Sequence, residues 1–227
     1  MSRFWARAET LHLGPDALAA AGKSHPLAGD LAAALASVPP NWLPRGTRCR
    51  VVLDDALLRY ALVRWPAGVG GRGEQAAYVA HRLREVHGIG APEWQWQVDR
   101  EAPPRPAVVC AMPAALLAAI RRLAGEQGWR IESIQGAFCA LFNDRRRELS
   151  ASLGALVWWR PGRSTIGVWQ DGAWLGLRSQ AVEGDAGAAL ALALASMGAA
   201  NQSGVVYASK GLSVPAGWTA CLLGESS

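Results

Sequence analysis

Clusters of metal-ligand residues are missing from this sequence. Its 227 residues include only four cysteines and four histidines. No two cysteines form a CxxC pair, and the histidines lack the spacing of zinc sites. The cysteines are Cys49, Cys110, Cys139 and Cys221. Each lies in apolar sequence, where a thiol behaves as a small hydrophobic group. We therefore expect reduced core cysteines and no metal site.

Long apolar runs are also missing. The best candidate for a membrane span is Ala186–Ala200, which is alanine-rich and has only Ser196 as a polar residue. It is shorter than the roughly 18 to 20 residues that a spanning helix needs. The N-terminus has no continuous apolar segment of the kind found in secretion signals. We therefore expect a soluble, cytoplasmic protein.

Charge of one sign is not concentrated in any long stretch. The net charge of +5 comes mainly from arginines that are spread along the chain. The one dense cluster is Arg145–Arg147, at the end of a predicted helix, where cations complement the helix dipole. The aromatic residues do not alternate with lysines as they would on a stacking platform. We therefore expect no nucleic-acid partner.

A complete phosphate-binding loop is absent as well. The glycine-rich segment Trp65–Gly73 lacks the GK[ST] ending of a P-loop and the register of a GxGxxG motif. It precedes a predicted helix, so its glycines fit a flexible lead into that helix. No nucleophile elbow and no obvious carboxylate pair is recognisable, which leaves an unrelated small-molecule enzyme with little support.

The residues that are present predict a mixed α/β protein. With 51% hydrophobic and 18% charged residues, the chain can bury a substantial core. Alternating and helical apolar spacings define the elements. The predicted strands are Ala6–Leu13, Cys49–Leu53, Leu58–Val63, Glu93–Asp99, Ala107–Met112, Arg130–Ile134, Ala155–Arg160, Ser164–Trp169, Ala173–Arg178, Gly204–Ala208 and Thr219–Leu223. The predicted helices are Leu27–Val38, Glu74–His87, a helix from Pro113 to a stop at Gly128, Ala137–Glu148 and Asp185–Met197.

Tryptophan is unusually frequent, with eleven residues against three tyrosines and three phenylalanines. Several indoles lie on the three strands after Ser150, which tight turns join into a β-meander; the Asp171-Gly172 step is a strong hairpin signal. Trp158 and Trp159 are adjacent, so strand alternation sends one ring to each face. Core packing is the simplest role for the indoles, and an apolar groove for a partner peptide is the alternative.

Several segments resemble the actin-like proteins of bacterial pilus and secretion machinery, namely the PilM family and the GspL- and MshI-type cytoplasmic domains. Val51–Tyr60 and Pro66 are similar to the strands that open the family's inserted subdomain. Val108–Pro113 and its helix resemble the second half of that subdomain, and Arg130–Phe142 resembles the return to the main lobe. Gln170–Trp174 is similar to part of the second-lobe sheet.

The resemblance implies an α/β, actin-like (ribonuclease H-like) fold that is reduced in size and carries an inserted α+β subdomain. The first lobe would cover residues 1–150, with the inserted subdomain at about 48–135. The second lobe would cover residues 151–227 and contain the β-meander, a helix and further strands.

The residues that hold Mg-ATP in actin-like ATPases are not matched. Such ATPases use an acidic residue and glycines in the first hairpin of each lobe, and a glycine pair near the end. Here the first hairpin offers Gly14 and Asp16 without an Asp-x-Gly motif, and the second lobe begins with the bulky Trp158 and Trp159. The tail offers Ser209–Gly211 and no glycine pair. We expect no nucleotide cofactor, no catalytic residue and no enzyme activity.

The alternative is an active ATPase of the same fold. Asp16, Asp54 or Asp55, and Asp171 would then be the carboxylates associated with Mg²⁺. Each also has an ordinary structural role, in a turn, at a strand end or in a hairpin.

The resemblance also implies a protein partner. In the PilM family, a groove beside the inserted subdomain receives the cytoplasmic tail of an inner-membrane assembly protein. The corresponding region here is residues 48–66 and 106–135, and we expect Arg59, Tyr60 and Arg64 on an exposed partner-binding surface. The implied function is a non-catalytic cytoplasmic scaffold of type IV pilus or type II secretion-like machinery. A separate membrane protein would anchor it, so its membrane association would be indirect, at the inner face of the inner membrane.

Overall fold

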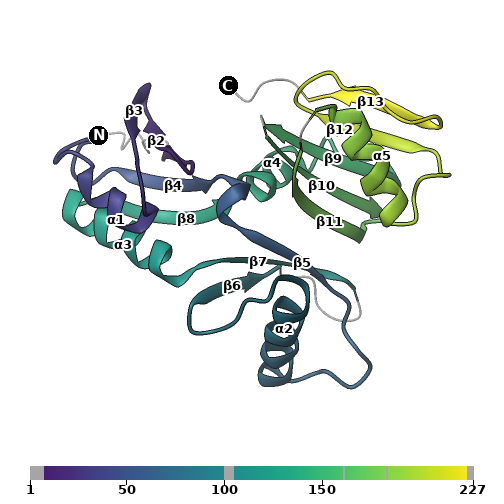
Figure 1. Ribbon diagram of the computed structural model, residues 1–227, viewed down its shortest axis with the longest axis horizontal. Helices are drawn as coiled ribbons and strands as arrows, with labels where there is room; N and C mark the ends of the chain where they lie inside the picture. The colour runs from purple at the N-terminus through teal and green to yellow at the C-terminus, as the bar shows by residue number, and fades with distance from the viewer. Residues whose placement is uncertain (1–7, 100–104, 161, 183, 224–227) are drawn as a thin grey trace, which may run out of the picture. The chain divides into compact units, whose positions relative to one another are not determined.

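The computed structural model describes residues 8–99, 105–160, 162–182 and 184–223 (Figure 1). The chain separates into two compact units. Unit 1 comprises the described parts of Met1–Leu58, Pro92–Gln95 and Met112–Ala137. Unit 2 comprises the described parts of Arg59–Ala91, Trp96–Ala111 and Phe138–Ser227. The predicted lobe boundary at residue 150 stays a prediction.

Unit 1 contains a five-stranded sheet with the strand order β3-β2-β1-β4-β8. Its strands are β1 (Glu9–Leu13), β2 (Ala17–Ala20), β3 (Lys23–Pro26), β4 (Arg48–Leu53) and β8 (Arg130–Gly136). β1, β2 and β3 pair antiparallel, whereas β4 pairs parallel with both β1 and β8. Three predicted strands of this unit are confirmed; Ala6 and Arg7 of the first lie outside the described residues.

Helices pack against this sheet. Helix α1 (Leu31–Ala34) continues as the 3-10 helix η1 (Leu35–Ser37), so the helical segment is shorter than the predicted Leu27–Val38. It begins after Asp30, whose carboxylate accepts a hydrogen bond from the Ala33 amide and caps the helix. Helix α3 (Ala114–Gln127) begins after Pro113 and ends at Gly128, which has a φ of +71°. Both ends of α3 were predicted, because proline suits a helix start and glycine tolerates the left-handed cap.

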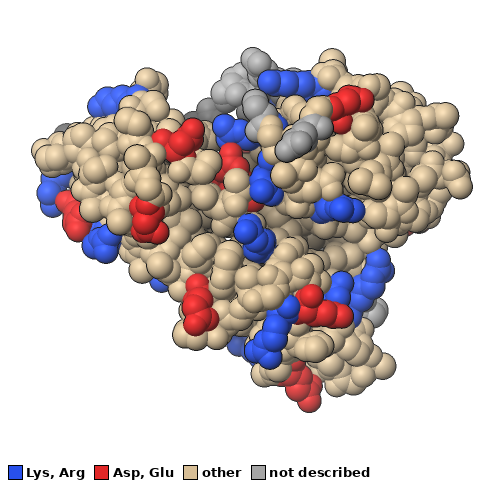
Figure 2. Space-filling view, in the orientation of Figure 1, with Lys and Arg blue, Asp and Glu red and all other residues tan. Residues whose placement is uncertain are grey.

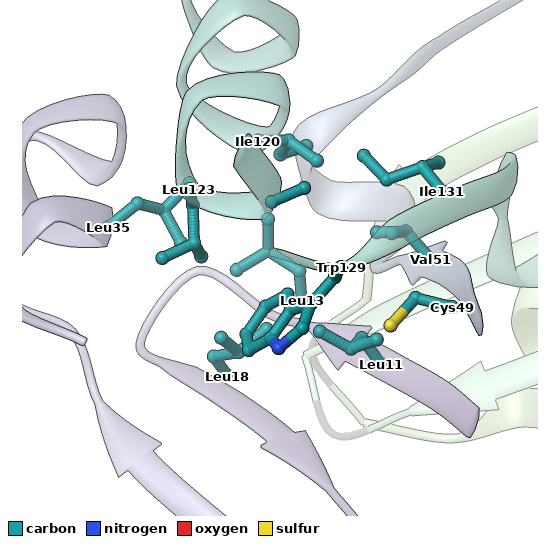
Figure 3. Close-up of a pocket in the computed structure, with 11 residues that line it drawn as sticks. Leu11, Leu13, Leu18, Leu35, Cys49, Val51, Ile120, Leu123, Trp129 and Ile131 are labelled. Atoms are coloured by element: carbon teal, nitrogen blue, oxygen red, sulfur yellow. The ribbon is translucent and has the colours of Figure 1, made fainter. Parts of the chain in front are cut away.

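The core of unit 1 lies between α3 and its sheet (Figure 3). Leu11 and Leu13 of β1, Val51 of β4, and Ile120 and Leu123 of α3 surround a cavity of about 20 Å³. The cavity is apolar and holds one water at most, so we expect it to be dry. Its wall includes Cys49, which is fully buried.

Burial decides the chemistry of the cysteine thiols. Desolvation, with the nearby charges of Glu9 and Glu132, raises the pKa of Cys49 to about 11. All four cysteines are free thiols, as predicted. Cys110 and Cys139 are half-buried, but Cys221 is exposed, so the expectation of a core position is wrong for Cys221. Its apolar neighbours lie on an edge strand, where apolar sequence does not ensure burial.

Unit 2 contains a second five-stranded sheet, with the order β11-β10-β9-β12-β13. Its strands are β9 (Leu153–Arg160), β10 (Arg163–Gln170), β11 (Ala173–Ala181), β12 (Gly204–Ala208) and β13 (Trp218–Leu222). The first three pair antiparallel, and β12 pairs parallel with β9 and β13. The sheet therefore repeats the topology of the unit 1 sheet, and the predicted β-meander and both later strands are confirmed.

Two different layers cover this sheet. On one face, helix α5 (Ala186–Ser196) packs against an aliphatic core that includes Val157, Ile166 and Val206. On the other face, Trp169 and Trp174 lie against aromatic side chains of helix α4 (Ala137–Arg145). Trp159 packs at the edge of the aliphatic core, and Trp158 is half-buried on the opposite face. Core packing therefore accounts for Trp169 and Trp174, and neither Trp158 nor Trp159 is fully exposed.

The aromatic layer requires glycine on two strands. A Cβ atom at Gly154 would lie 2.3 Å from the Trp169 ring, and one at Gly167 would lie 2.6 Å from the Phe138 ring. Carbon atoms cannot approach this closely, so any other residue would displace the rings.

The insertion between β4 and α3 forms a three-stranded sheet with the order β5-β7-β6, packed against helix α2. Its elements are β5 (Arg59–Val63), β6 (Trp94–Val98), β7 (Ala107–Pro113) and α2 (Arg72–His87), and the 3-10 helix η2 (Asp55–Leu57) precedes β5. The amides of Gly70 and Gly71 each donate to the Glu74 carboxylate at 3.1 Å. These hydrogen bonds lower the pKa of Glu74, and the bond from Gly71 has the larger effect. The glycine-rich segment thus caps α2, as its lead-in position suggested.

Within the described ranges, no helix has the length and apolar character needed to cross a membrane.

We predict that Gly154→Ala lowers the free energy of unfolding by about 1–3 kcal/mol, because the new methyl group overpacks the Trp169 site. Gly211→Ala is the matched control, since its Cβ would meet nothing within 4 Å. It should change stability by less than about 0.5 kcal/mol. Urea denaturation followed by tryptophan fluorescence measures both. Equal effects of the two substitutions would contradict this packing.

We also predict that iodoacetamide at pH 8 modifies Cys221 at least about 100-fold faster than Cys49, because a two-unit rise in pKa lowers the thiolate fraction by that factor. The neutral Cys49 thiol contributes stability that is fully present below pH 9.0 and is lost as the pH rises through about 11. Mass spectrometry of the folded protein gives the two rates. Similar rates would show that the Cys49 site is open to solvent.

Candidate functional site

The first hairpin of each sheet is a short turn. Between β1 and β2, the Gly14 amide donates to the Ala17 carbonyl at 2.8 Å and closes the turn. Between β9 and β10, Arg160 pairs with Arg163, so only Pro161 and Gly162 separate the strands. A phosphate loop directs several successive backbone amides at one anion. Proline has no amide hydrogen, so by sequence the β9–β10 turn offers only the Gly162 amide between its two strands.

The four candidate Mg²⁺ carboxylates have separate structural surroundings. Asp16 is exposed in the β1–β2 turn. Asp54 caps η2 by accepting a hydrogen bond from Ala56, and its own amide donates to the carbonyl of Leu13, which places it beside that turn. Asp55 is buried at the start of η2. Asp171 lies in the β10–β11 hairpin of unit 2, at a φ of +49°. Among the described residues, no group of three or more His, Cys, Asp or Glu side chains could hold a metal ion.

A hollow lies within unit 2. It has a volume of about 470 Å³, within the range of ligand-binding clefts. We call it the β5–β11 cleft. Its walls come from β5, α2, β11 and the end of α5. The lining residues are Tyr60, Ala61, Leu62 and Arg64 of β5 and its end, Tyr78, Arg82 and Val86 of α2, Leu175, Gly176, Leu177 and Arg178 of β11, and Ser196 and Met197.

The cleft runs along strand edges. Neighbouring residues of a strand point to opposite faces, yet Leu175–Arg178 are four consecutive residues that all line the cleft. A surface that touches consecutive residues must lie along the edge of the strand. β11 is an edge strand of its five-stranded sheet, and β5 is an edge strand of the three-stranded sheet. The cleft therefore borders two sheet edges.

The charges that line the cleft are all positive. Arg64 comes from the end of β5, Arg82 from α2 and Arg178 from β11. Arg64 donates to the carbonyl of Leu175 at 2.8 Å, and Arg82 forms an exposed ion pair with Glu85 at 2.7 Å. No aspartate or glutamate is among the described residues that line it. The face drawn in Figure 2 carries both blue and red groups.

The three predicted partner-binding residues are not equivalent. Tyr60 and Arg64 both line the cleft, whereas Arg59 is half-buried and does not. Tyr60 is only 4% exposed, so the expectation of an exposed ring is wrong. Its ring contacts Phe138, with 6.4 Å between ring centroids, and its carbonyl accepts a hydrogen bond from His87 Nε2. Whether these residues bind a partner stays a prediction.

The sequence pointed to Tyr60 and Arg64 only, and Arg178 and Val86 are among the cleft residues that it missed. Arg178 ends a predicted strand, and Val86 belongs to the predicted apolar face of α2, yet Val86 is 44% exposed. The strand order, which makes β11 an edge, is a tertiary property. Val86 continues the helical spacing of the buried Val79 and Leu83, so no local signal marks it as exposed.

Comparison with known proteins identifies the fold. No known protein family and no curated protein sequence matches this chain. The cytoplasmic domain of EpsL, an inner-membrane component of the type II secretion system of Vibrio cholerae, is similar in structure with a TM-score of 0.59 and 15% identity, over 96% of this chain and 90% of that one. A Bacteroides thetaiotaomicron protein with an actin-like ATPase fold and unknown function has a TM-score of 0.60 and 13% identity, over 91% and 82% of the two chains.

The PilM–PilN type IV pilus biogenesis complex also contains a similar chain, with a TM-score of 0.56 and 15% identity. The match covers 83% of this chain and 65% of that one. These likenesses establish an actin-like fold, which agrees with the repeated sheet topology of the two units. The predicted fold, and the predicted resemblance to PilM- and GspL-type proteins, are confirmed at this level.

The burial of Tyr60 changes what its substitution should do. We predict that Tyr60→Ala lowers the free energy of unfolding by about 3–5 kcal/mol, because it removes a buried ring. Arg64→Ala, at an exposed position of the same cleft, should cost less than about 1 kcal/mol. Thermal and urea denaturation of the two variants measure the difference. A Tyr60→Ala variant as stable as wild type would mean that the ring is exposed after all.

Proposed function

We propose that this chain is a non-catalytic scaffold of a type IV pilus or type II secretion-like assembly machine. In this proposal it binds the cytoplasmic segment of an inner-membrane protein and does not turn over ATP. It would work in the cytoplasm, at the inner face of the inner membrane, where the partner holds it. Its fold, shared with a type II secretion component and with a chain of a type IV pilus complex, is the observation that carries the proposal.

The short hairpin turns support the non-catalytic part. The resemblance to actin-like ATPases implies phosphate binding in the first hairpin of each lobe, and here those turns are three and two residues long by the strand bounds. The glycines within β9 and β10, Gly154 and Gly167, lie against aromatic rings. Mg²⁺ also needs several oxygen ligands in near-octahedral geometry, whereas Asp54 uses its carboxylate to cap η2.

The β5–β11 cleft supports the binding part. It combines exposed apolar area, such as Val86, with arginines, and arginine and large apolar groups are common at protein interfaces. Two of the three residues that the sequence pointed to, Tyr60 and Arg64, line it. Arg64, the more exposed of them, is the better residue for testing partner contact, because its loss should leave the fold intact.

We predict that Mg-ATP causes no saturable change in tryptophan fluorescence up to millimolar concentration. Trp158 and Trp159 flank the second hairpin and would report a bound nucleotide. Binding in the micromolar range would overturn the non-catalytic assignment in favour of an active ATPase. A Mg²⁺-dependent signal that Asp16→Asn abolishes would identify the β1–β2 turn as its site.

The partner is tested by affinity capture from detergent-solubilised inner membranes. We predict that wild type and the control Arg121→Glu retain the same inner-membrane protein, whereas Arg64→Glu loses it. Arg121 is an exposed residue of α3 and does not line the cleft. Recovery of soluble metabolic enzymes alone would contradict the scaffold role.

A further inference from the structure

Strand β13 is an exposed edge of the unit 2 sheet (Figure 1). It pairs with β12 on one side, in regular register over all five of its residues. Trp218 at its start is buried, but the next four residues, Thr219–Leu222, are all exposed. Leu222 is 64% exposed, although it is an apolar residue. An edge of this kind presents main-chain amides and carbonyls with which a further strand can pair.

The other sheet edges have features that discourage such pairing, and β13 has none of them. β3 carries Lys23 and Pro26, and β8 carries Arg130 and Glu132. β5 and β11 pack along each other, and the apolar residues of β6 are half-buried. Charge, proline and coverage are the usual means by which proteins protect an edge. The sequence of β13, Trp-Thr-Ala-Cys-Leu, contains neither a charge nor a proline.

Helix α5, which lies beside β13, has no charged residue either. From Ala186 to Ser196 it consists of alanine, leucine, one glycine and one serine. Leu190 and Leu194 pack with Trp218 in one core, whereas Leu192 is 57% exposed. A charged partner would gain no ion pair on these two elements. A second copy of the same neutral surface would meet no like charge, so the surface suits another copy of this chain.

A two-fold axis perpendicular to the sheet makes this surface self-complementary. Two copies of β13 then run antiparallel, and a register centred on Ala220 places each Leu222 opposite Trp218 of the second copy. The exposed end of each strand thus lies beside the covered end of the other. Because side chains alternate along a strand, Ala220 and Leu222 share the face of Trp218, which is the face that α5 covers.

We propose that this chain forms a symmetric dimer by antiparallel pairing of β13 with β13 of a second copy. The pairing joins two five-stranded sheets into one continuous sheet and covers Leu222 of both copies. It goes beyond the proposed function and does not depend on it, because the described lining of the β5–β11 cleft includes no residue of β13. Five paired residues form a contact smaller than the roughly 800 Å² per partner of a standard interface, so we expect a weak dimer with a dissociation constant on the order of micromolar.

Charges placed at the two-fold axis test this arrangement by sedimentation velocity across the micromolar range. Ala220→Lys puts two ammonium groups opposite each other, and Ala220→Glu puts two carboxylates there. Each substitution should therefore raise the dissociation constant of the dimer about tenfold or more. An equal mixture of the two variants should form a heterodimer about as tight as the wild-type dimer, because the opposite charges then face each other.

Val86→Lys is the matched control, since Val86 is also an exposed apolar residue and lies on α2, outside this surface. It should dimerise as wild type does. Ala220 is exposed, so its variants should fold, and unchanged thermal midpoints check this.

Cross-linking of the wild-type protein locates the contact without any substitution. In the proposed register the two Cys221 side chains are diagonal neighbours on one face, about 7–8 Å apart. A short bismaleimide should join them, and Cys221→Ser should abolish the cross-link while the dimer persists. A monomer at every concentration, an Ala220→Lys dimer as tight as wild type, or a cross-link that persists in Cys221→Ser would each overturn the inference.

Discussion

The contact between Trp169 and the glycine backbone of β9 is the constraint on which unit 2 depends. Because Gly154 has no side chain, the indole lies directly on the sheet, stacked on Tyr207 and edge-on to Trp174. Trp174 in turn meets Phe138 and Phe142 of α4, and Phe138 meets Tyr60 of β5. One continuous aromatic layer therefore connects the five-stranded sheet to the strand that forms a wall of the cleft. Such rings bury large apolar areas and add specific edge-to-face contacts.

This layer also relates the fold to the proposed function. In a nucleotide-binding relative, glycines near the hairpins would leave the backbone accessible to phosphates. Here the glycines of β9 and β10 admit indole and phenyl rings. The aromatic layer reaches Tyr60 of β5, so it lies directly behind one wall of the β5–β11 cleft.

Much of the fold could be predicted from the sequence, because the signals were local. Alternation defined the strands, Pro113 and Gly128 marked the ends of α3, and Asp171-Gly172 marked a hairpin. The candidate site was less accessible, because it depends on which strands are neighbours. Tyr60 lies on an alternating strand whose two faces cannot be told apart until α4 is placed, so its burial was missed. Arg178 looks like any strand-end arginine until β11 is known to be an edge.

Hydrogen–deuterium exchange of the protein, alone, with Mg-ATP and with solubilised inner-membrane proteins, tests the central claim most directly. The account predicts that the membrane proteins slow exchange in β11 and β5, while Mg-ATP leaves the β1–β2 and β9–β10 hairpins unchanged. Slowed exchange at both hairpins with Mg-ATP, and none at β11 with the membrane proteins, would contradict it.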